Sequence, residues 1–296
     1  MPATKEGFQF TDDDAMLVRH IHECRLATVD HLAALTERRP KDVHRRLFRL
    51  ASRHYLQVIN RRPQKSVYAI GKEGISVLVE RGVAPRELLE WRIRHAELKP
   101  LFLDHELLIT DVYTRLTVAS RTSHLKLITW RQDRGLWDFA PVVEDGERNM
   151  LPVRPDAYFV LEDSERPQGK NHRSFFLEAD RSTTTHRRFQ LKLLAYWSYL
   201  QNGLHTKKLG LTGSFYVVTV TLTDERAAGL CAAAREVLPD EADKFFLFTS
   251  LPKIPLHTPA PIMGDVFLSP RDYDEGRRYP LIRRAAQPLT ATDGAG

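Results

Sequence analysis

An arginine-rich helical segment that leads into two short apolar segments around a basic turn is the feature that most constrains the fold of this chain. Residues 40–53 begin with Pro40, which suits the first turn of a helix. Apolar residues then recur at helical spacing and form one stripe, Val43, Leu47 and Leu50. Residues 55–70 read as a strand, a basic turn and a second strand. The sequence therefore predicts a helix followed by a β-hairpin.

Three further helical segments surround this arrangement. Residues 11–24 start with Thr11, a suitable N-cap, and have acids in the first turn. A shorter helix is expected at residues 29–35, and a closing helix at residues 71–82. This order of elements resembles that of a winged helix domain, with the hairpin as the wing and the preceding helix as the recognition helix.

The positive charge of the chain is concentrated in the same segment. Ten Lys or Arg residues and a single acid, Asp42, lie between Arg38 and Lys65, so this segment carries +9. The net charge of the whole chain is +6, which leaves −3 for the remainder. A local basic stripe is typical of proteins that bind the phosphate backbone of nucleic acids.

We therefore expect double-stranded DNA as the partner of this domain. The recognition helix would lie in the major groove and the wing on the phosphate backbone. The predicted DNA-binding residues are Lys41, Arg45, Arg46 and Arg49 on the helix, and Arg61, Arg62 and Lys65 on the wing. The alternative is a winged helix that contacts another protein, and winged helices also form homodimers.

The length of 296 residues suggests two domains of roughly 150 residues each, and the order of the expected elements suggests an α+β protein. We expect a winged helix at residues 8–82, a connecting helix at 83–100, an α/β domain at 101–270 and a flexible tail at 271–296. No apolar run approaches the ~20 residues that a membrane-spanning helix needs. The two cysteines lie far apart in the sequence and indicate no disulfide framework, which fits the cytoplasm.

The second domain is expected to have the order α-β-β-β-α-β-α-β, with a polar turn at residues 144–152. Three strands in a meander followed by helical crossovers predict a central mixed sheet covered by helices. Thr183 and Asp224 are the expected N-caps of the last two helices.

Carboxylates gather on two neighbouring strands of this predicted sheet. Alternation places Glu178 and Asp180 on one face of the strand that starts with "FFLEADR", and Asp156 lies on the strand before it. Oxygen ligands of this kind suit Mg²⁺. Asp156, Glu178 and Asp180 are therefore predicted metal ligands. The alternative is an ion-pair cluster in which Arg154, Arg181 or Lys192 neutralises the acids.

These motifs resemble the PD-(D/E)xK pattern of restriction-endonuclease-like domains. Pro155 and Asp156 match the first element, and Glu178 and Ala179 match the start of the second. Asp180 stands where that pattern has lysine. The resemblance implies that the following helix supplies the cation, through Lys192 or through Arg187 or Arg188, and that Glu106 adds a further acid. The catalytic residues would then be Asp156, Glu178, Asp180 and Lys192.

The chain as a whole resembles the replication-relaxation family of plasmids and mobile elements. The resemblance rests on "YAIGKEG", "LDHELLITDVY", "RPDAYFVL", "FFLEADRST", "LKLLAYWSYL" and "FFLFTS". It implies a bacterial cytoplasmic protein that acts in replication, relaxation or transfer of such DNA, in company with replication or transfer proteins. Two functions stay open: a divergent Mg²⁺-dependent nuclease or nickase, and a non-catalytic DNA-binding regulator or replication accessory protein.

Overall fold

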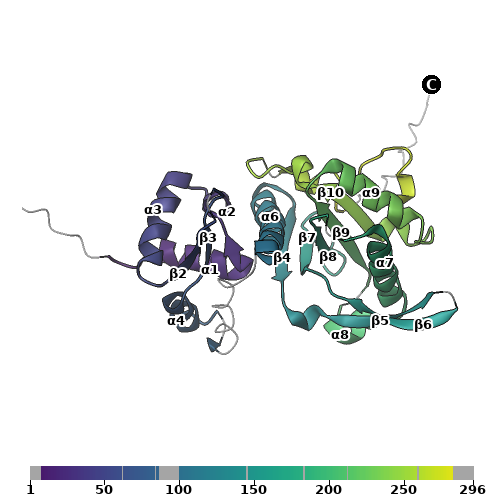
Figure 1. Ribbon diagram of the computed structural model, residues 1–296, viewed down its shortest axis with the longest axis horizontal. Helices are drawn as coiled ribbons and strands as arrows, with labels where there is room; N and C mark the ends of the chain where they lie inside the picture. Colours follow the sequence, from purple (N-terminus) through teal and green to yellow (C-terminus); the bar gives the residue numbers. More distant parts are fainter. Residues whose placement is uncertain are drawn as a thin grey trace, which may run out of the picture. The chain divides into compact units, whose positions relative to one another are not determined.

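The computed structural model describes residues 8–61, 63–83, 85–86, 100–144, 146–182, 184–211, 213–258 and 260–282 (Figure 1). Most of the predicted connecting helix at 83–100 and the last part of the predicted tail lie outside these ranges. The chain divides into two compact units, Met1–Arg121 and Thr122–Gly296. Each unit is described by itself.

The first unit contains the predicted winged helix. Its helices are α1 (Asp12–Cys24), α2 (Val29–Thr36), α3 (Pro40–Ala51) and α4 (Lys72–Glu80). Its strands are β1 (Leu26–Ala27), β2 (Leu56–Ile59) and β3 (Val67–Ile70), which form an antiparallel sheet in the order β1-β3-β2. The expected order of helices and hairpin is confirmed, and the two-residue strand β1 is an addition that the sequence did not suggest.

Local sequence signals explain where these helices begin. Thr11 caps α1 in a capping box with Asp14, and Thr28 caps α2 in the same way with His31. Pro40 occupies the first turn of α3, where a missing N–H costs no hydrogen bond. The apolar stripe of α3, Val43, Leu47 and Leu50, is buried in the core of the unit.

Helix α6 (Pro100–Thr122) belongs almost entirely to the first unit, although the sequence placed it in the second domain. Its Thr110 hydroxyl donates to the carbonyl oxygens of Cys24 and Leu26, at 3.2 and 2.8 Å. Its Tyr113 hydroxyl donates to Glu23 at 2.6 Å. These contacts with α1 and β1 explain why the helix joins the winged helix.

The second unit is built on a mixed five-stranded sheet in the order β10-β9-β8-β7-β4 (Figure 1). Strands β4 (Leu125–Arg131), β7 (Ala157–Asp163) and β8 (His172–Asp180) form an antiparallel meander, and β9 (Phe215–Thr221) and β10 (Phe246–Ser250) continue parallel to β8. The helices are α7 (His186–Gln201), α8 (Leu204–Leu209) and α9 (Asp224–Arg235). The predicted mixed sheet with helical crossovers is confirmed. Short 3₁₀ turns lie at 134–136, 243–245, 251–253, 260–263 and 270–272.

A β-hairpin is inserted between β4 and β7, where the sequence suggested only a polar turn. Its strands are β5 (Asp138–Glu144) and β6 (Glu147–Val153), and they form a two-stranded sheet of their own. The polar character of residues 147–149 obscured the second strand, because those side chains face solvent. Helix starts also differ by one or two residues, since Thr185 caps α7 and Thr223 caps α9.

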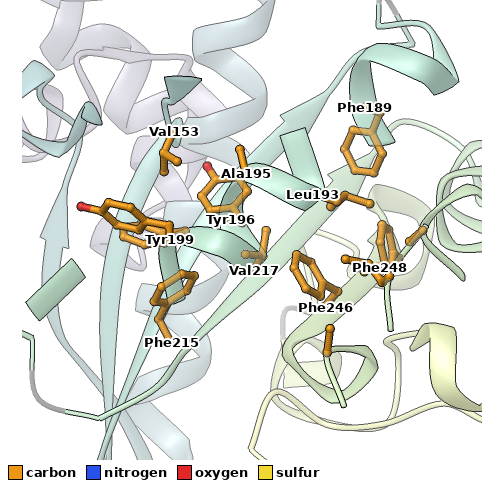
Figure 2. Close-up of a cluster of buried hydrophobic side chains, with 14 of the residues drawn as sticks. Val153, Phe189, Leu193, Ala195, Tyr196, Tyr199, Phe215, Val217, Phe246 and Phe248 are labelled. Carbon is orange, nitrogen blue, oxygen red and sulfur yellow. The ribbon is translucent and has the colours of Figure 1, made fainter. Parts of the chain in front are cut away.

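Helices α7 and α9 pack on one face of the five-stranded sheet and form its main core (Figure 2). Tyr196 and Tyr199 of α7 are buried among Phe215, Val217 and the inner face of the hairpin, which includes Val153. Within the described part of the chain, every helix is too short or too polar to cross a lipid bilayer.

Candidate functional site

The pairing of β7 with β8 brings two of the predicted ligands to the same edge of the sheet. Ala157 lies opposite Leu177, so Asp156, just before β7, lies at the level of Glu178. The Asp156 N–H donates to the Leu177 carbonyl oxygen at 2.9 Å, and the Ala179 N–H donates to Asp156 Oδ2 at 2.7 Å. Asp156 is thus fixed against the end of β8 through both its backbone and its side chain.

Glu178 is buried beneath α7, with only 3% of its surface exposed. Lys192 Nζ donates to Glu178 Oε2 at 2.5 Å, and the Tyr196 hydroxyl donates to Glu178 Oε1 at 2.5 Å. Lys192 and Tyr196 stand one turn apart on α7, so a single helix face supplies both donors. The helix that follows β8 therefore places a cation against the carboxylate, as the resemblance to endonuclease-like domains implied.

Burial has the largest effect on the pKa of Glu178. It raises the pKa of Glu178 to about 7, against the opposing pull of Lys192, and the nearby Asp156 charge adds to the rise. Burial alone would lower the pKa of Lys192, but Glu178 and Asp156 raise it above its usual value. Burial and Glu178 together raise the pKa of Tyr196, which remains a hydrogen-bond donor. Lys192 is therefore held as a cation between two carboxylates.

Asp180 shares the sheet face of Glu178 but has a different partner. Arg226 of α9 donates two hydrogen bonds to it, from Nε to Oδ1 at 2.8 Å and from Nη2 to Oδ2 at 3.1 Å. The Ser182 N–H also donates to Asp180 Oδ1 at 2.8 Å. Both carboxylate oxygens of Asp180 are thus satisfied by protein donors.

Arg226 is the residue of this centre that sequence reasoning missed. Arg226 lies in the first turn of α9, where the helix dipole disfavours a positive charge. Its position there is a weak signal that a carboxylate compensates its charge. The basic partners expected from the sequence included Arg154, but its guanidinium lies over the rings of Trp137 and Phe139 instead. Glu106, expected as a further acid, accepts hydrogen bonds from Arg25 in the first unit.

The donor set tests whether Mg²⁺ suits this centre. Asp156 and Glu178 offer hard carboxylate oxygens at the same edge of the sheet, which fits the ion. Both acids of β8 are held by protein donors in this arrangement, Asp180 by Arg226 and Glu178 by Lys192 and Tyr196, so an ion would have to replace some of these bonds. Among the described residues, the group of three or more His, Cys, Asp or Glu side chains that lie close enough together to share one ion is His124, Asp163 and Glu165, at the far end of β7.

The exposed face of α3 is the second candidate site. Lys41, Arg45 and Arg49 all point to solvent, although Arg45 also contacts Asp42 at 3.2 Å. Phe48 stands among them with 69% of its surface exposed, a large apolar side chain that the sequence reading did not single out. The opposite side of the helix is buried, so these residues form a surface that is accessible to a binding partner.

Arg46 has a structural role instead. It pairs through two nitrogens with Asp14, whose side chain is fully buried, and donates to the Gln9 carbonyl oxygen at 2.9 Å. Burial alone would raise the pKa of Asp14, but the hydrogen bonds from Arg46 and Thr11 hold it below its usual value. This ion pair ties α3 to α1.

The wing residues also differ from one another. Arg61 is largely buried and pairs with Asp104 of α6. Lys65 contacts Asp30 but keeps 70% of its side chain exposed. Arg62 lies outside the described residues. Lys65 is therefore the described wing cation that remains accessible to a phosphate.

These features define an α+β protein with an N-terminal winged helix and a mixed-sheet second unit that holds a buried Glu–Lys–Tyr network. The chain belongs to the replication-relaxation family, since the model of that family matches residues 18–214. The family resemblance predicted from the sequence is confirmed. No curated protein and no solved structure gives a significant match.

Proposed function

We propose that this protein binds double-stranded DNA through α3 and acts in the replication or relaxation of plasmid or mobile-element DNA. The family suggests such a role. The observation that carries the DNA-binding part is the exposed face of α3, where Lys41, Arg45 and Arg49 surround Phe48.

The chemistry of this face suits the major groove. Arginine can bond the guanine edge with two nitrogens or bind phosphates, and lysine binds phosphates as a point charge. An exposed phenylalanine can contact the methyl group of thymine. Lys65 on the wing would add a phosphate contact, whereas Arg46 and Arg61 are already bound by Asp14 and Asp104.

The double substitution Arg45→Ala with Arg49→Ala tests this proposal. Fluorescence anisotropy with a labelled duplex should show weaker binding, and the slope of log K against log salt should fall by roughly 1 for each of the two arginines that binds a phosphate. Arg235→Ala with Arg277→Ala is a matched control, since it removes two exposed arginines of the second unit. Equal affinity of the α3 variant and the wild type would refute the assignment and favour a protein-binding winged helix.

A second candidate function is Mg²⁺-dependent cleavage or nicking of DNA. It is favoured by the contact of Lys192 with Glu178 and by the position of Asp156 at the same edge of the sheet. Asp156 and Glu178 would hold the ion, which would stabilise charge on the scissile phosphate and activate a water molecule. Lys192, a cation between the two carboxylates, would orient the phosphate or the water. Asp180 would keep its structural bond to Arg226.

Plasmid cleavage assays in Mg²⁺ or Mn²⁺ decide between the enzyme and a non-catalytic binder. We expect Asp156→Ala, Glu178→Ala and Lys192→Ala each to abolish nicking of supercoiled plasmid. Glu241→Ala is the matched control, because this exposed acid lies between α9 and β10, outside the candidate centre. Cutting that persists in both carboxylate variants would rule out this centre. A wild type that shifts plasmid mobility without cutting would identify a DNA-binding regulator or replication accessory protein.

A further inference from the structure

The inserted hairpin presents an apolar face to solvent that the proposed function does not use. Trp137, just before β5, is 40% exposed, Phe139 is 48% exposed and Val143 is 69% exposed. Met150 of β6, which lies opposite Pro141, is 59% exposed. Residues 137, 139, 141 and 143 alternate along the strand and therefore share one face. We call this surface, with its flanking arginines, the outer hairpin face.

The opposite face of the hairpin is apolar too, because it packs against α7. Ala140, Val142 and Val153 are buried in the main core with Tyr196 and Tyr199, and Figure 2 shows Val153 beside these rings. A solvent-facing antiparallel ribbon normally alternates between apolar residues inside and polar residues outside. Large apolar side chains on the exposed side as well indicate a binding surface.

Arginine side chains lie over the exposed rings. The guanidinium carbon of Arg154 is 5.1 Å from the ring centre of Trp137 and 5.9 Å from that of Phe139. The guanidinium carbon of Arg134, which precedes the hairpin, lies 5.3 Å from the same Trp137 ring centre. Within the described ranges, neither arginine forms an ion pair with an acid. The base of the hairpin therefore combines two exposed aromatic rings with two cations that form no ion pair with an acid of the described residues.

Nearby acids are directed elsewhere. Asp138 accepts a hydrogen bond from the buried Tyr199 at 3.0 Å, and Asp133 pairs with Arg131. Glu147 is exposed, but it lies at the tip of the hairpin, opposite Glu144 and six register positions from the base. Arg134 and Arg154 therefore place positive charge at the base of the hairpin, beside the aromatic rings.

We propose that the outer hairpin face binds single-stranded DNA, with bases stacked on Trp137 and Phe139 and phosphates held by Arg134 and Arg154. Aromatic rings interleaved with arginine are the combination that binds unpaired bases without sequence preference. A second copy packed on this face through the same surface would bring the same arginines against Arg134 and Arg154, so the charge favours an anionic occupant. The inference rests on the proposed action on DNA.

The sequence connects this surface to the carboxylate centre. Arg154 is followed by Pro155 and then by Asp156, whose side chain is bonded to the end of β8. Arg154 and Asp156 are thus two positions apart in the chain. A DNA strand that Arg154 holds would lie near Asp156. The proposed surface would therefore bring a bound single strand near the chain segment that begins the carboxylate centre.

The test compares Trp137→Ala with Phe139→Ala, as a double variant, against the wild type. A labelled oligo(dT) strand and a labelled duplex of equal length are titrated by fluorescence anisotropy. We expect the double variant to bind the single strand at least ~30-fold more weakly, because two stacking contacts are lost, and to bind the duplex as well as the wild type does. Trp137→Phe should retain single-strand binding, because it keeps a ring. Ile128→Ala, which truncates an exposed residue of β4, is the matched control.

The two DNA probes separate this inference from the proposed function. Arg45→Ala with Arg49→Ala should weaken duplex binding and leave oligo(dT) binding intact, so loss of one activity does not imply loss of the other. Equal oligo(dT) affinities of the wild type and the hairpin variant would overturn the inference. A wild-type dimer in light scattering that dissociates in the hairpin variant, with oligo(dT) affinity unchanged, would also overturn it and assign the face to a second copy.

Discussion

Lys41 and Arg49 of helix α3 lie in an environment opposite to that of Lys192 of helix α7. On α3, Lys41 and Arg49 extend into solvent. On α7, Lys192 turns inward to a carboxylate that is almost fully buried. The difference lies in what stands opposite each helix, because a cation enters the interior only where an acid receives it.

Each inward-facing cation of this kind has such an acid. Lys192 has Glu178, Arg226 has Asp180, and Arg46 on α3 itself has Asp14. A single helix can therefore divide its charges between two tasks. Arg46 fixes α3 to α1, and its neighbours remain available to a partner.

Arg226→Ala should have the largest effect, because it leaves Asp180 buried without its cation. Breaking a buried ion pair from one side typically costs about 3–5 kcal/mol of stability. Urea unfolding followed by circular dichroism would show a lower midpoint. Arg235→Ala serves as the control, since both it and its partner Asp274 are exposed and such pairs contribute about 0–1 kcal/mol. Similar midpoints for the two variants would remove the distinction between buried and exposed cations.

Glu178→Gln should change how stability depends on pH. In the unfolded chain Glu178 ionises near its ordinary pKa of 4.5, whereas burial in the folded protein raises that pKa to about 7. Between these values the folded state retains a proton that the unfolded state has lost, so the contribution of Glu178 to stability falls as the pH rises through this window. The substituted glutamine side chain has no carboxyl group to ionise and should flatten this part of the curve.

Urea midpoints measured from pH 4.5 to pH 7 would check the effect of Glu178→Gln. Glu165→Gln is a suitable control, because this acid is exposed. A pH profile identical to that of the wild type would mean that Glu178 is already ionised throughout the window and that Lys192 outweighs burial.

Lys41→Ala should have the smallest effect. An exposed lysine that binds one phosphate contributes about 1 unit to the salt slope of DNA binding, and its removal should weaken binding to all sequences alike. Titrations of two unrelated duplexes at several salt concentrations would measure both quantities. A loss confined to one duplex would show instead that Lys41 reads a base.

The winged helix was predictable because its signals are local. Thr11 and Pro40 mark helix starts, and the stripe of Val43, Leu47 and Leu50 marks the buried face within one helix. The candidate centre was predictable in part for the same reason. Alternation along β8 put Glu178 and Asp180 on one face, and helical spacing made Lys192 available to that face.

The features that the sequence did not predict depend mainly on tertiary contacts. Arg226 lies 46 residues from Asp180, and only the packing of α9 on the sheet brings them together. The sequence did not indicate strand β6, because its first residues are polar and face solvent and so lack the apolar alternation of a strand. Arg46 pairs with Asp14, which lies 32 residues away in the sequence. This contact removes Arg46 from the basic surface of α3, to which composition alone assigns it.

The inserted hairpin also has a consequence for how the second unit folds. Leu125 of β4 pairs with Asp163 of β7, so the two strands are distant in sequence, and closing a long loop has an entropic cost. Strands β5 and β6 pair with each other across a tight turn and form within this loop. An early hairpin would shorten the disordered chain between β4 and β7, and we expect substitutions that weaken it to slow refolding more than they speed unfolding.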